Sequence, residues 1–461
     1  MSPFTVRDVV RATQGALIGG DLGVPVTAVS IDSRTLGVGE AFFAIGGHTL
    51  DGHQFIAEAA ARGASCLVVH HLPDELPLGV PVVLVDDTTR ALGRLSAFHR
   101  SRFQLPLVAV TGSNGKTTVK EMIATLLGTR WSVLKSAGSF NNQWGLPLTL
   151  LQLSPAHQAV VVELGTNQPG EIASLARICR PTVGVVTTVA AAHTEFLKTL
   201  DGVGEEKAAL VRAIPREGSV VLNWDDRRVS EMAALAGGRV IRVGSGSGAQ
   251  LRAAGVAERI GELHFTLEIE GRRSPVRLAF SGRHNVTNAL LAAGAALALN
   301  FPLPEIVAGL EAARPVKGRL IWRRAGSVRI LDDTYNANPA SMRAALDALA
   351  VARGRGRLLV ALGDMLELGE LAREAHREIG RLVAALGVAE FVGMGPRMKN
   401  AVEAAREAGL DESYHVEAFE DAVALLLKRL APNDALLVKG SRGMRMERVV
   451  DTLVARLGGG G

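Results

Sequence analysis

Two closely spaced glycines, followed at once by a lysine and two threonines, form the part of this sequence with the clearest chemical potential. The stretch is Thr111-Gly112-Ser113-Asn114-Gly115-Lys116-Thr117-Thr118. Glycine lets the backbone adopt positive φ angles and pass close to a ligand, and the amides at a helix N-terminus suit an anion. Lys116 adds a mobile positive charge for phosphate oxygens, and the Thr117 hydroxyl is placed to bind Mg²⁺. The stretch therefore predicts a phosphate-binding loop.

The spacing within this loop is G-x-x-G-K-T, two residues shorter between its glycines than the usual G-x-x-x-x-G-K-[ST] pattern. An apolar, β-branched run at 107–111 precedes the loop, and a helical pattern at 117–127 follows it. The alternative is an ordinary strand, turn and helix that happens to contain these residues. We favour phosphate binding because strand, loop and helix all fall where it needs them.

Three further residues could hold a metal ion or act beside it. Glu163 ends the apolar run 159–163, and a parallel strand would bring its carboxylate to the edge that carries the loop. The alternative for Glu163 is a structural ion pair. His193 follows the run 183–189, but a single histidine is usually structural. Lys207 stands in a helical pattern beside two glutamates, where spacing alone predicts a solvated side chain.

Polar residues also gather after a later apolar run, in the stretch Asp332-Asp333-Thr334-Tyr335-Asn336-Ala337-Asn338-Pro339. Acids and amides at the carboxyl end of a strand are typical of a ligand-binding rim. The alternative is capping of the next helix, with Pro339 in its first turn. Asn285 and Asn288 open another helical pattern, where their amides either cap the helix or bind a base edge.

Alternating strand and helix patterns predict the elements that position these residues. In the middle of the chain, strands at 107–111, 159–163 and 183–189 alternate with helices at 117–127, 171–179 and 204–213. This alternation indicates a parallel sheet with helical crossovers. The run 263–269 suggests antiparallel strands, and a long helix is expected at 286–299.

Both ends of the chain also have α/β patterns. The N-terminal part predicts helices at 6–12 and 55–62, with strands at 26–31, 41–45, 65–69 and 81–85. The C-terminal part alternates strands and helices throughout, which indicates a doubly wound, Rossmann-like sheet. We therefore expect a three-domain α/β protein: a small α/β domain (1–103), a central phosphate-loop ATPase domain with a parallel sheet (104–316) and a Rossmann-like domain (317–461).

Composition excludes several classes of protein. The 461 residues are 48% hydrophobic, with 51 Lys+Arg against 46 Asp+Glu, so a globular chain is expected. No dense basic run is present, and two tyrosines and four tryptophans are too few for a nucleic-acid binder that stacks bases. The most apolar window, 286–299, is too short to span a membrane. With no secretion signal, and with Cys66 and Cys179 expected to be buried thiols, we expect a cytoplasmic protein.

Taken together, these segments resemble the Mur ligase superfamily, and within it the members that add D-alanyl-D-alanine to UDP-N-acetylmuramoyl-tripeptide. The resemblance covers nearly the whole chain. It rests on the phosphate loop and on the stretches 30–34, 51–53, 141–149, 163–172, 192–193, 284–289, 332–339, 362–369 and 439–444. The phosphate loop is shared by the superfamily, whereas Tyr335-Asn336 and Gly363-Asp364-Met365-Leu366-Glu367-Leu368-Gly369 are specific to that type.

The resemblance implies roles for particular residues. Glu163 and His193 match magnesium ligands, and Lys207 matches a lysine that many members carbamylate, so that Lys116, His193 and Lys207 become the catalytic candidates. Nucleotide contacts are implied at Asn285, Asn288, Arg319 and Asp333. Binding of the peptide substrate is implied at Ser30, Ser33, Arg34, Asp51, His53, Asn141, Asn142, Tyr335 and Asn336, with the UDP end at Ser33 and Arg34. One departure is Gln143-Trp144, where an acidic and then an aliphatic residue are expected.

The implied reaction is ATP-driven amide formation in peptidoglycan synthesis, with Mg²⁺, an acyl-phosphate intermediate and release of ADP and phosphate. A monomer without nucleic-acid partners or membrane insertion is expected. Rival interpretations are the preceding ligase of the pathway, a folylpolyglutamate synthetase, a GTPase-type switch and a small-molecule kinase. The diaminopimelate-adding form of the first carries Asp-Asn-Pro-Arg, where this chain has Asn338-Pro339-Ala340. A GTPase should show Asn-Lys-x-Asp, which the sequence lacks.

Overall fold

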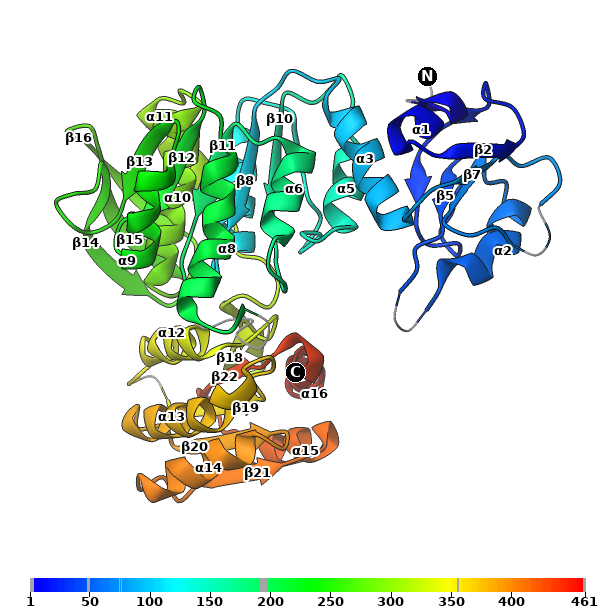
Figure 1. Ribbon diagram of the computed structural model, residues 1–461. Helices are drawn as coiled ribbons and strands as arrows, with labels where there is room; N and C mark the ends of the chain where they lie inside the picture. Colours follow the sequence, from blue (N-terminus) through cyan, green and yellow to red (C-terminus); the bar gives the residue numbers. More distant parts are fainter. Residues whose placement is uncertain are drawn as a thin grey trace. The chain divides into compact units, whose positions relative to one another are not determined.

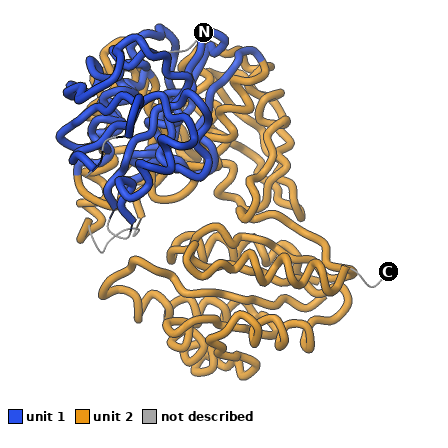
Figure 2. The backbone as a smooth tube through the Cα atoms, turned by 90° about the vertical axis from the view of Figure 1, so that its right-hand side faces the viewer, with its two compact units in different colours: residues 1–109, 130–166, 170–182 blue, residues 110–129, 167–169, 183–461 orange. Residues whose placement is uncertain are grey.

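The computed structural model describes residues 4–47, 50–73, 75, 77–190, 197–354 and 356–458. The chain separates into two compact units, drawn in different colours in Figure 2. Unit 1 comprises Met1–Ala109, Arg130–Thr166 and Gly170–Thr182, and unit 2 comprises Val110–Thr129, Asn167–Pro169 and Val183–Gly461.

Unit 1 begins with a five-stranded sheet in the order β2-β7-β6-β5-β4. Its strands are β2 (Ala16–Gly19), β4 (Val29–Ser30), β5 (Ala41–Phe43), β6 (Cys66–Val69) and β7 (Val82–Leu84). Strands β4 to β7 are parallel and β2 is antiparallel. One core lies under α1 (Val6–Thr13) and α3 (Thr88–Arg100), and a second lies under α2 (Ile56–Ala61). The carboxyl ends of β4, β5 and β6 therefore share one edge.

The strand expected at 26–31 is wrong as a single element. The structure has β3 (Pro25–Val26), which pairs with β1 (Phe4–Thr5), and then β4, which pairs with β5. The backbone between them changes sheets, because Thr27 and Ala28 form their hydrogen bonds with Gly39 and Ala41. The rest of unit 1 holds β9 (Val133–Lys135) parallel to β10 (Ala159–Glu163), with α5 (Gly145–Leu150) and α6 (Glu171–Cys179).

Strand β8 (Leu107–Thr111) leads directly into the phosphate loop and α4 (Lys116–Leu127) of unit 2. The strands that follow run in the order β11-β12-β13-β14-β15-β16, parallel as far as β14 and antiparallel beyond it. They are β11 (Val183–Val186), β12 (Ser219–Asn223), β13 (Arg239–Val243), β14 (Leu251–Arg259), β15 (Glu262–Ile269) and β16 (Arg272–Leu278). Helix α10 (His284–Ala298) packs against α4, β12 and β13, and α11 (Leu303–Ala312) also packs on α4.

The last sheet has the order β17-β18-β22-β19-β20-β21, and all its strands except β17 are parallel. They are β17 (Ile321–Ala325), β18 (Val328–Asp333), β19 (Leu358–Gly363), β20 (Glu390–Met394), β21 (Ser413–Val416) and β22 (Ala435–Lys439). Figure 1 shows the helices on both faces. One core joins the sheet to α12 (Pro339–Ala350), α13 (Ala372–Ala385) and α14 (Met398–Glu407), and the other to α15 (Phe419–Arg429) and α16 (Glu447–Gly458). The expected doubly wound sheet is confirmed.

The expectation of two buried thiols is also confirmed. Cys66 and Cys179 are both free and buried, and burial raises the pKa of each thiol to about 12. They are therefore inert packing residues. Within the described residues, no helix combines the length and the apolar character that a membrane crossing requires.

Candidate functional site

The two glycines of the phosphate loop are required by the loop's conformation. Gly112 has a φ of 144° and Gly115 a φ of 84°, both in the region that side chains rarely adopt. A Cβ on Gly112 would lie 1.9 Å from Thr187 Oγ1, and a Cβ on Gly115 would lie 2.5 Å from Asn288 Oδ1. The loop is therefore folded tightly against its neighbours, and the first turn of α4 follows it at once.

The loop is fixed in place by the backbone that follows β11. The Ser113 amide donates to the Thr188 carbonyl at 2.8 Å, and the Asn114 amide donates to Thr188 Oγ1 at 3.2 Å. The Ser113 hydroxyl and the Ala190 amide also form a hydrogen bond, at 2.9 Å. These bonds explain why β11 ends at Val186 and not at Val189 as expected, because the next residues bond to the loop.

Lys116 extends back over the loop. Its Nζ donates to the Gly112 carbonyl at 2.8 Å, across the turn that the glycines form. The first amides of any helix lack acceptors inside the helix, so the start of α4 presents donors and a positive dipole end beside this lysine. Thr117 and Thr118, both buried, stand in that first turn. This arrangement is suited to a phosphate chain.

Two side chains from the segments that precede β17 and α12 reach the same loop within unit 2. Arg319 Nη2 donates to Thr117 Oγ1 at 2.9 Å, and the Arg319 guanidinium lies 4.2 Å from the centre of the Tyr335 ring. Asn338 Nδ2 donates to Asn114 Oδ1 at 2.7 Å. Arg319 Nε is buried and, within the described part of the chain, has no hydrogen-bond partner. A second cation therefore stands at the threonine that follows Lys116.

Asp333, expected to contact nucleotide, is held in a buried ion pair. Lys439 Nζ lies 2.6 Å from Asp333 Oδ2 and also donates to the Asn336 carbonyl at 2.7 Å. The other carboxylate oxygen of Asp333 accepts the Leu320 amide at 3.2 Å. The carboxylate and the backbone beside it are thus fixed at the end of β18.

The capping alternative for this segment is correct at one residue. Asn338 is the N-cap of α12, where its side chain accepts from the Ser341 amide, and Pro339 is the first residue of the helix. The same side chain donates to Asn114, so Asn338 both caps α12 and contacts the phosphate loop.

Asn285 and Asn288 lie one turn apart in α10, and both are buried. Asn285 Nδ2 donates to the Ser281 carbonyl and Asn288 Nδ2 donates to Asn285 Oδ1, each at 2.7 Å. Because Asn288 Oδ1 also faces Gly115, this pair connects the start of α10 to the loop.

Lys207 is the clearest departure from what spacing alone predicts. It lies in the middle of α8 (Leu200–Ala213) and is 2% exposed, not solvated. Burial, with repulsion from Lys116 as a smaller cause, lowers the pKa of its amine to about 7. No hydrogen bond or ion pair joins this amine to any part of the chain that the structure describes. A buried amine in this state is neutral in a large fraction of molecules at neutral pH, and it can then act as a nucleophile.

The remaining metal candidates are Glu163 and His193. Glu163 ends β10, is 2% exposed and accepts a hydrogen bond from Asn141 Nδ2 at 2.8 Å. Asn141 thus orients a candidate metal ligand in unit 1, and its expected contact with substrate stays a prediction. His193 lies outside the described residues.

Among the N-terminal candidates, Ser30 ends β4 and the others follow β4 or β5 in the chain. Arg34 is exposed and its hydrogen bonds lower the pKa of Asp32 to about 2. Ser30 Oγ accepts the Asp32 amide at 3.1 Å, and Ser33 donates to Glu58 Oε2 at 3.0 Å. Asp51 accepts from the His53 amide and ring.

The two residues after Asn141 have structural contacts. Asn142 Oδ1 accepts the Gly145 amide at 2.8 Å, at the start of α5. Trp144, part of the unexpected Gln143-Trp144 pair, packs on the core beneath α3 and donates from its ring to Thr89 Oγ1. The departure at Trp144 is therefore accommodated by packing in unit 1.

Sequence reasoning missed several residues that shape the site. Thr188 bonds to the loop, Lys439 neutralises Asp333, and Asn338 contacts Asn114. A signal existed for Lys439, since a lysine that ends an apolar strand has to find a counter-charge when it is buried. No sequence signal indicated that Thr188 and Asn114 meet.

Three models of Mur ligase domains match this chain. They are described as the Mur ligase family catalytic domain (residues 25–100), the Mur ligase middle domain (residues 110–296) and the Mur ligase glutamate ligase domain (residues 318–442). A UDP-N-acetylmuramoyl-tripeptide–D-alanyl-D-alanine ligase from Escherichia coli strain K12 is 35% identical, and the alignment covers 98% of this chain and 99% of that protein.

Two solved structures extend the similarity to the fold. A crystal structure of MurF from Acinetobacter baumannii superposes with a TM-score of 0.91 and 32% identity, covering 98% of this chain and 99% of that one. MurF from Thermotoga maritima, solved in complex with ADP, superposes with a TM-score of 0.83 and 26% sequence identity. That match covers 94% of this chain and 98% of the other. The expected three-domain α/β fold is confirmed, and the domain boundaries stay predictions.

Proposed function

This chain belongs to the Mur ligase family, and from that premise we propose that it joins D-alanyl-D-alanine to UDP-N-acetylmuramoyl-tripeptide with cleavage of ATP. The reaction belongs to the synthesis of peptidoglycan. The observation that carries the ATP half of the proposal is the tight glycine loop with Lys116 across it and Arg319 at Thr117. The full-length similarity to ligases of that name supports the substrate half.

The chemistry needs two anions to approach each other. The terminal carboxylate of the tripeptide attacks the γ-phosphate of ATP to give an acyl phosphate and ADP. The amine of D-alanyl-D-alanine then attacks the acyl carbon, and phosphate leaves as the amide forms. Lys116 and Arg319 supply positive charge where the phosphate oxygens crowd, and this fixed charge lowers the barrier without covalent catalysis. Asn285 and Asn288 are proposed to contact the nucleoside, and Asp333 to hold the far side of the nucleotide.

We propose Thr117, Glu163, His193 and a carbamylated Lys207 as the residues that would hold Mg²⁺. A hydroxyl and a carboxylate are oxygen ligands that fit this ion, and both Thr117 and Glu163 are buried. When bound, Mg²⁺ supplies charge neutralisation on the phosphates.

The proposal for Lys207 rests on its buried amine. A neutral amine attacks CO₂ to form an N–C bond and loses a proton. The product is a carboxylate-like anion in place of the usual lysine cation. The protonated amine cannot do this because it has no lone pair. The lowered pKa of Lys207 keeps the neutral, reactive amine available, and the side chain is only 2% exposed.

The N-terminal residues are proposed to bind the UDP-linked substrate. Ser33 and Arg34 would hold the UDP end, with Ser30, Asp51 and His53 beside them. Asn141, Asn142, Tyr335 and Asn336 would contact the peptide. We assign substrate binding to residues 1–103, ATP binding to 104–316 and closure over the nucleotide to 317–461. Free buried thiols suit a cytoplasmic enzyme, which we propose acts as a monomer.

An assay of phosphate release tests this proposal. UDP-N-acetylmuramoyl-tripeptide and D-alanyl-D-alanine are omitted in turn from a mixture with ATP and Mg²⁺. We expect phosphate and amide product in equal amounts only when both are present. Phosphate release without the dipeptide, and no amide in the complete mixture, would reject the ligase in favour of a hydrolase.

The Lys207→Ala variant tests the carbamate separately. We expect loss of ligation and partial recovery with added short carboxylic acids, which replace the missing anion. Lys428→Ala, at an exposed position of α15, is the control and should keep wild-type activity. Full activity of Lys207→Ala would rule out a functional role for a carbamate on Lys207.

A further inference from the structure

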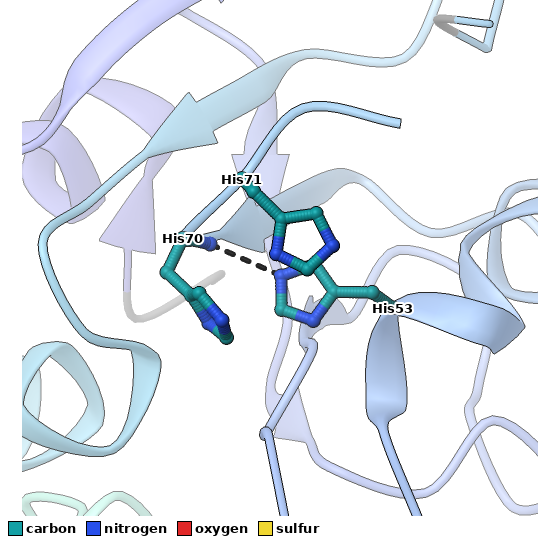
Figure 3. A group of neighbouring side chains, drawn as sticks. All are labelled: His53, His70 and His71. Atoms are coloured by element: carbon teal, nitrogen blue, oxygen red, sulfur yellow. Dashed lines mark hydrogen bonds between the residues drawn. The ribbon is translucent and has the colours of Figure 1, made fainter. Parts of the chain in front are cut away.

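Three histidine rings lie together at one edge of the N-terminal sheet (Figure 3). His53 comes from the short helix η1 (Gly52–Phe55), and His70 and His71 directly follow β6. One ring nitrogen from each lies within 4.8 Å of the others. His53 is the inner member, with a side chain 5% exposed, whereas His70 and His71 are exposed. None of the roles proposed above uses His70 or His71.

Asp51 fixes the chemical state of the inner histidine. Its Oδ1 lies 2.7 Å from His53 Nδ1, so the ring proton is assigned to Nδ1 and the lone pair to Nε2. Burial, together with repulsion from the two neighbouring histidines, lowers the pKa of His53. A neutral imidazole whose far nitrogen is bonded to a carboxylate is the form in which histidine binds metals.

The packing of the rings leaves this lone pair at the centre of the group. His71 stacks on His53 with ring centres 3.9 Å apart, and His70 stands edge-on to His53 at 4.2 Å. In the structure, His53 Nε2 accepts the backbone amide of His70 at 3.1 Å, in a solvent-exposed hydrogen bond. That amide can transfer to water at little cost, because it already lies at the surface.

Metal binding requires the two exposed rings to move while His53 stays in place. Four-coordinate zinc at about 2.05 Å from each nitrogen places its ligands about 3.3 Å apart. The observed nitrogens lie within 4.8 Å, so the widest separation has to close by about 1.5 Å. His71 also has to turn out of its stack on His53, because lone pairs in nearly parallel ring planes cannot point at one ion. His70 and His71 are exposed and can change rotamer without disturbing the core, while Asp51 keeps His53 in place.

We propose that His53, His70 and His71 form a binding site for a zinc-class divalent transition metal, with Asp51 as the residue that orients His53. Three neutral imidazoles suit Zn²⁺, Co²⁺ or Ni²⁺ and disfavour Mg²⁺, which prefers oxygen ligands. The fourth coordination position is left for water or for an oxygen ligand. The site is separate from the magnesium ligands proposed above. It shares Asp51 and His53 with the proposed substrate-binding residues, but its test does not depend on the ligase reaction.

Zinc titration of the untagged full-length chain tests the site. Isothermal calorimetry in excess Mg²⁺ measures zinc stoichiometry for the wild type, for His70→Ala/His71→Ala and for the control His264→Ala. His264 is half-exposed in β15 and pairs with Glu262, away from the triad in the sequence and in the other unit. We expect one more zinc per chain in the wild type and in the control than in the double variant. Asp51→Asn should weaken that zinc roughly 10- to 100-fold.

Cobalt gives an independent readout. Co²⁺ bound by three imidazoles should show visible d–d bands in the wild type that are absent from the double variant, and the bands should fade as acid protonates the histidines. Equal zinc stoichiometry and equal cobalt spectra for the wild type and the double variant would overturn the proposal. Since His70 and His71 are exposed, thermal unfolding should show that the double variant folds normally, so either result can be interpreted.

Discussion

Lys207 in α8 and Lys439 at the end of β22 are both 2% exposed, yet their surroundings differ in kind. Lys439 lies 2.6 Å from the Asp333 carboxylate and donates to the Asn336 carbonyl. The amine of Lys207 has no such partner within the described residues, and burial lowers its pKa to about 7. The same side chain at the same depth is therefore a structural cation in one region and a latent nucleophile in the other.

The difference shows what a buried amine needs. A charge taken out of water has to be paired or given up. Lys439 is paired, so it fixes Asp333 and the end of β18. Lys207 gives up its charge, so its neutral form is available for reaction with CO₂. Lys116, a partly exposed lysine, completes the series, because it can approach phosphate while it retains its charge.

The largest expected effect is on stability, and it comes from removing the buried amine of Lys207. In CO₂-depleted buffer, Lys207→Met should be more stable than the wild type by about 5 kcal/mol at pH 6, where the buried wild-type amine must carry a proton. The amine titrates at about 7 in the folded chain and at 10.5 when unperturbed. Between these values the unfolded chain holds a proton that the folded chain has lost, so wild-type stability rises with pH.

Denaturant unfolding at several pH values checks this prediction. The advantage of Lys207→Met should shrink by about 1.4 kcal/mol per pH unit between pH 7 and 9. Lys428→Met serves as the control and should show no such trend. An advantage that does not change with pH would mean that Lys207 is not a buried, neutral amine.

Removing the paired amine of Lys439 should lower stability, in contrast to the removal of Lys207. Lys439→Met leaves the Asp333 carboxylate buried without a cation, and the free energy of unfolding should fall by about 3–5 kcal/mol. The double variant Asp333→Asn/Lys439→Met should recover most of this loss, because the introduced amide would carry no charge and its oxygen could still accept the Leu320 amide. If the single and double variants were equally unstable, packing and not the ion pair would explain the loss.

The partly exposed lysine should affect rate and not stability. Lys116→Met should lower kcat/KM for ligation roughly 10²- to 10³-fold, because a preorganised charge at the phosphates is lost. Its free energy of unfolding should change by less than about 1 kcal/mol. Steady-state kinetics and urea unfolding of Lys116→Met and Lys428→Met separate the two effects. A large loss of stability in Lys116→Met would show that Lys116 has a structural role, as Lys439 has.

The smallest effect concerns the loop that carries Lys116. Gly115→Ala forces a side chain to adopt a φ of 84° and puts its Cβ 2.5 Å from Asn288 Oδ1. Gly261 has a similar φ of 79° with no atom near its missing Cβ, so Gly261→Ala measures the backbone strain alone. Gly115→Ala should cost about 1–2 kcal/mol more than Gly261→Ala. If Asn288→Ala removes this extra cost, the contact with Asn288 Oδ1 is its cause. Equal costs for Gly115→Ala and Gly261→Ala would show that the loop can move to accommodate the added Cβ.

Many elements could be predicted from local patterns. β8, β10 and α6 have the expected bounds, because each apolar run is bracketed by breakers or caps that act over a few residues. The expectations missed α3, whose pattern is interrupted by Gly93. A Cβ there would lie 3.0 Å from Ile178 Cδ1, so the glycine reflects the close approach of α6, which no local pattern reveals.

The candidate site divides along the same line. The phosphate loop was predictable because its glycines, lysine and threonine act within eight consecutive residues. The histidine triad was not, because 17 residues separate His53 from His70 and they meet only where parallel strands end at one edge. Asn338 was expected at a ligand-binding rim or as a helix cap, and neither interpretation could indicate its second partner 224 residues away.

By itself, then, the sequence determined the fold class, the family and a loop that has to bend sharply before a helix, since backbone preferences and residue types are local properties. Tertiary structure alone decided which lysine is paired and which is not, because burial and counter-charge depend on elements far apart in the chain. Nothing in the residues around Lys207 distinguishes it from a solvated lysine. The folded chain does so by burying the Lys207 amine while, within the described residues, no carboxylate forms an ion pair with it.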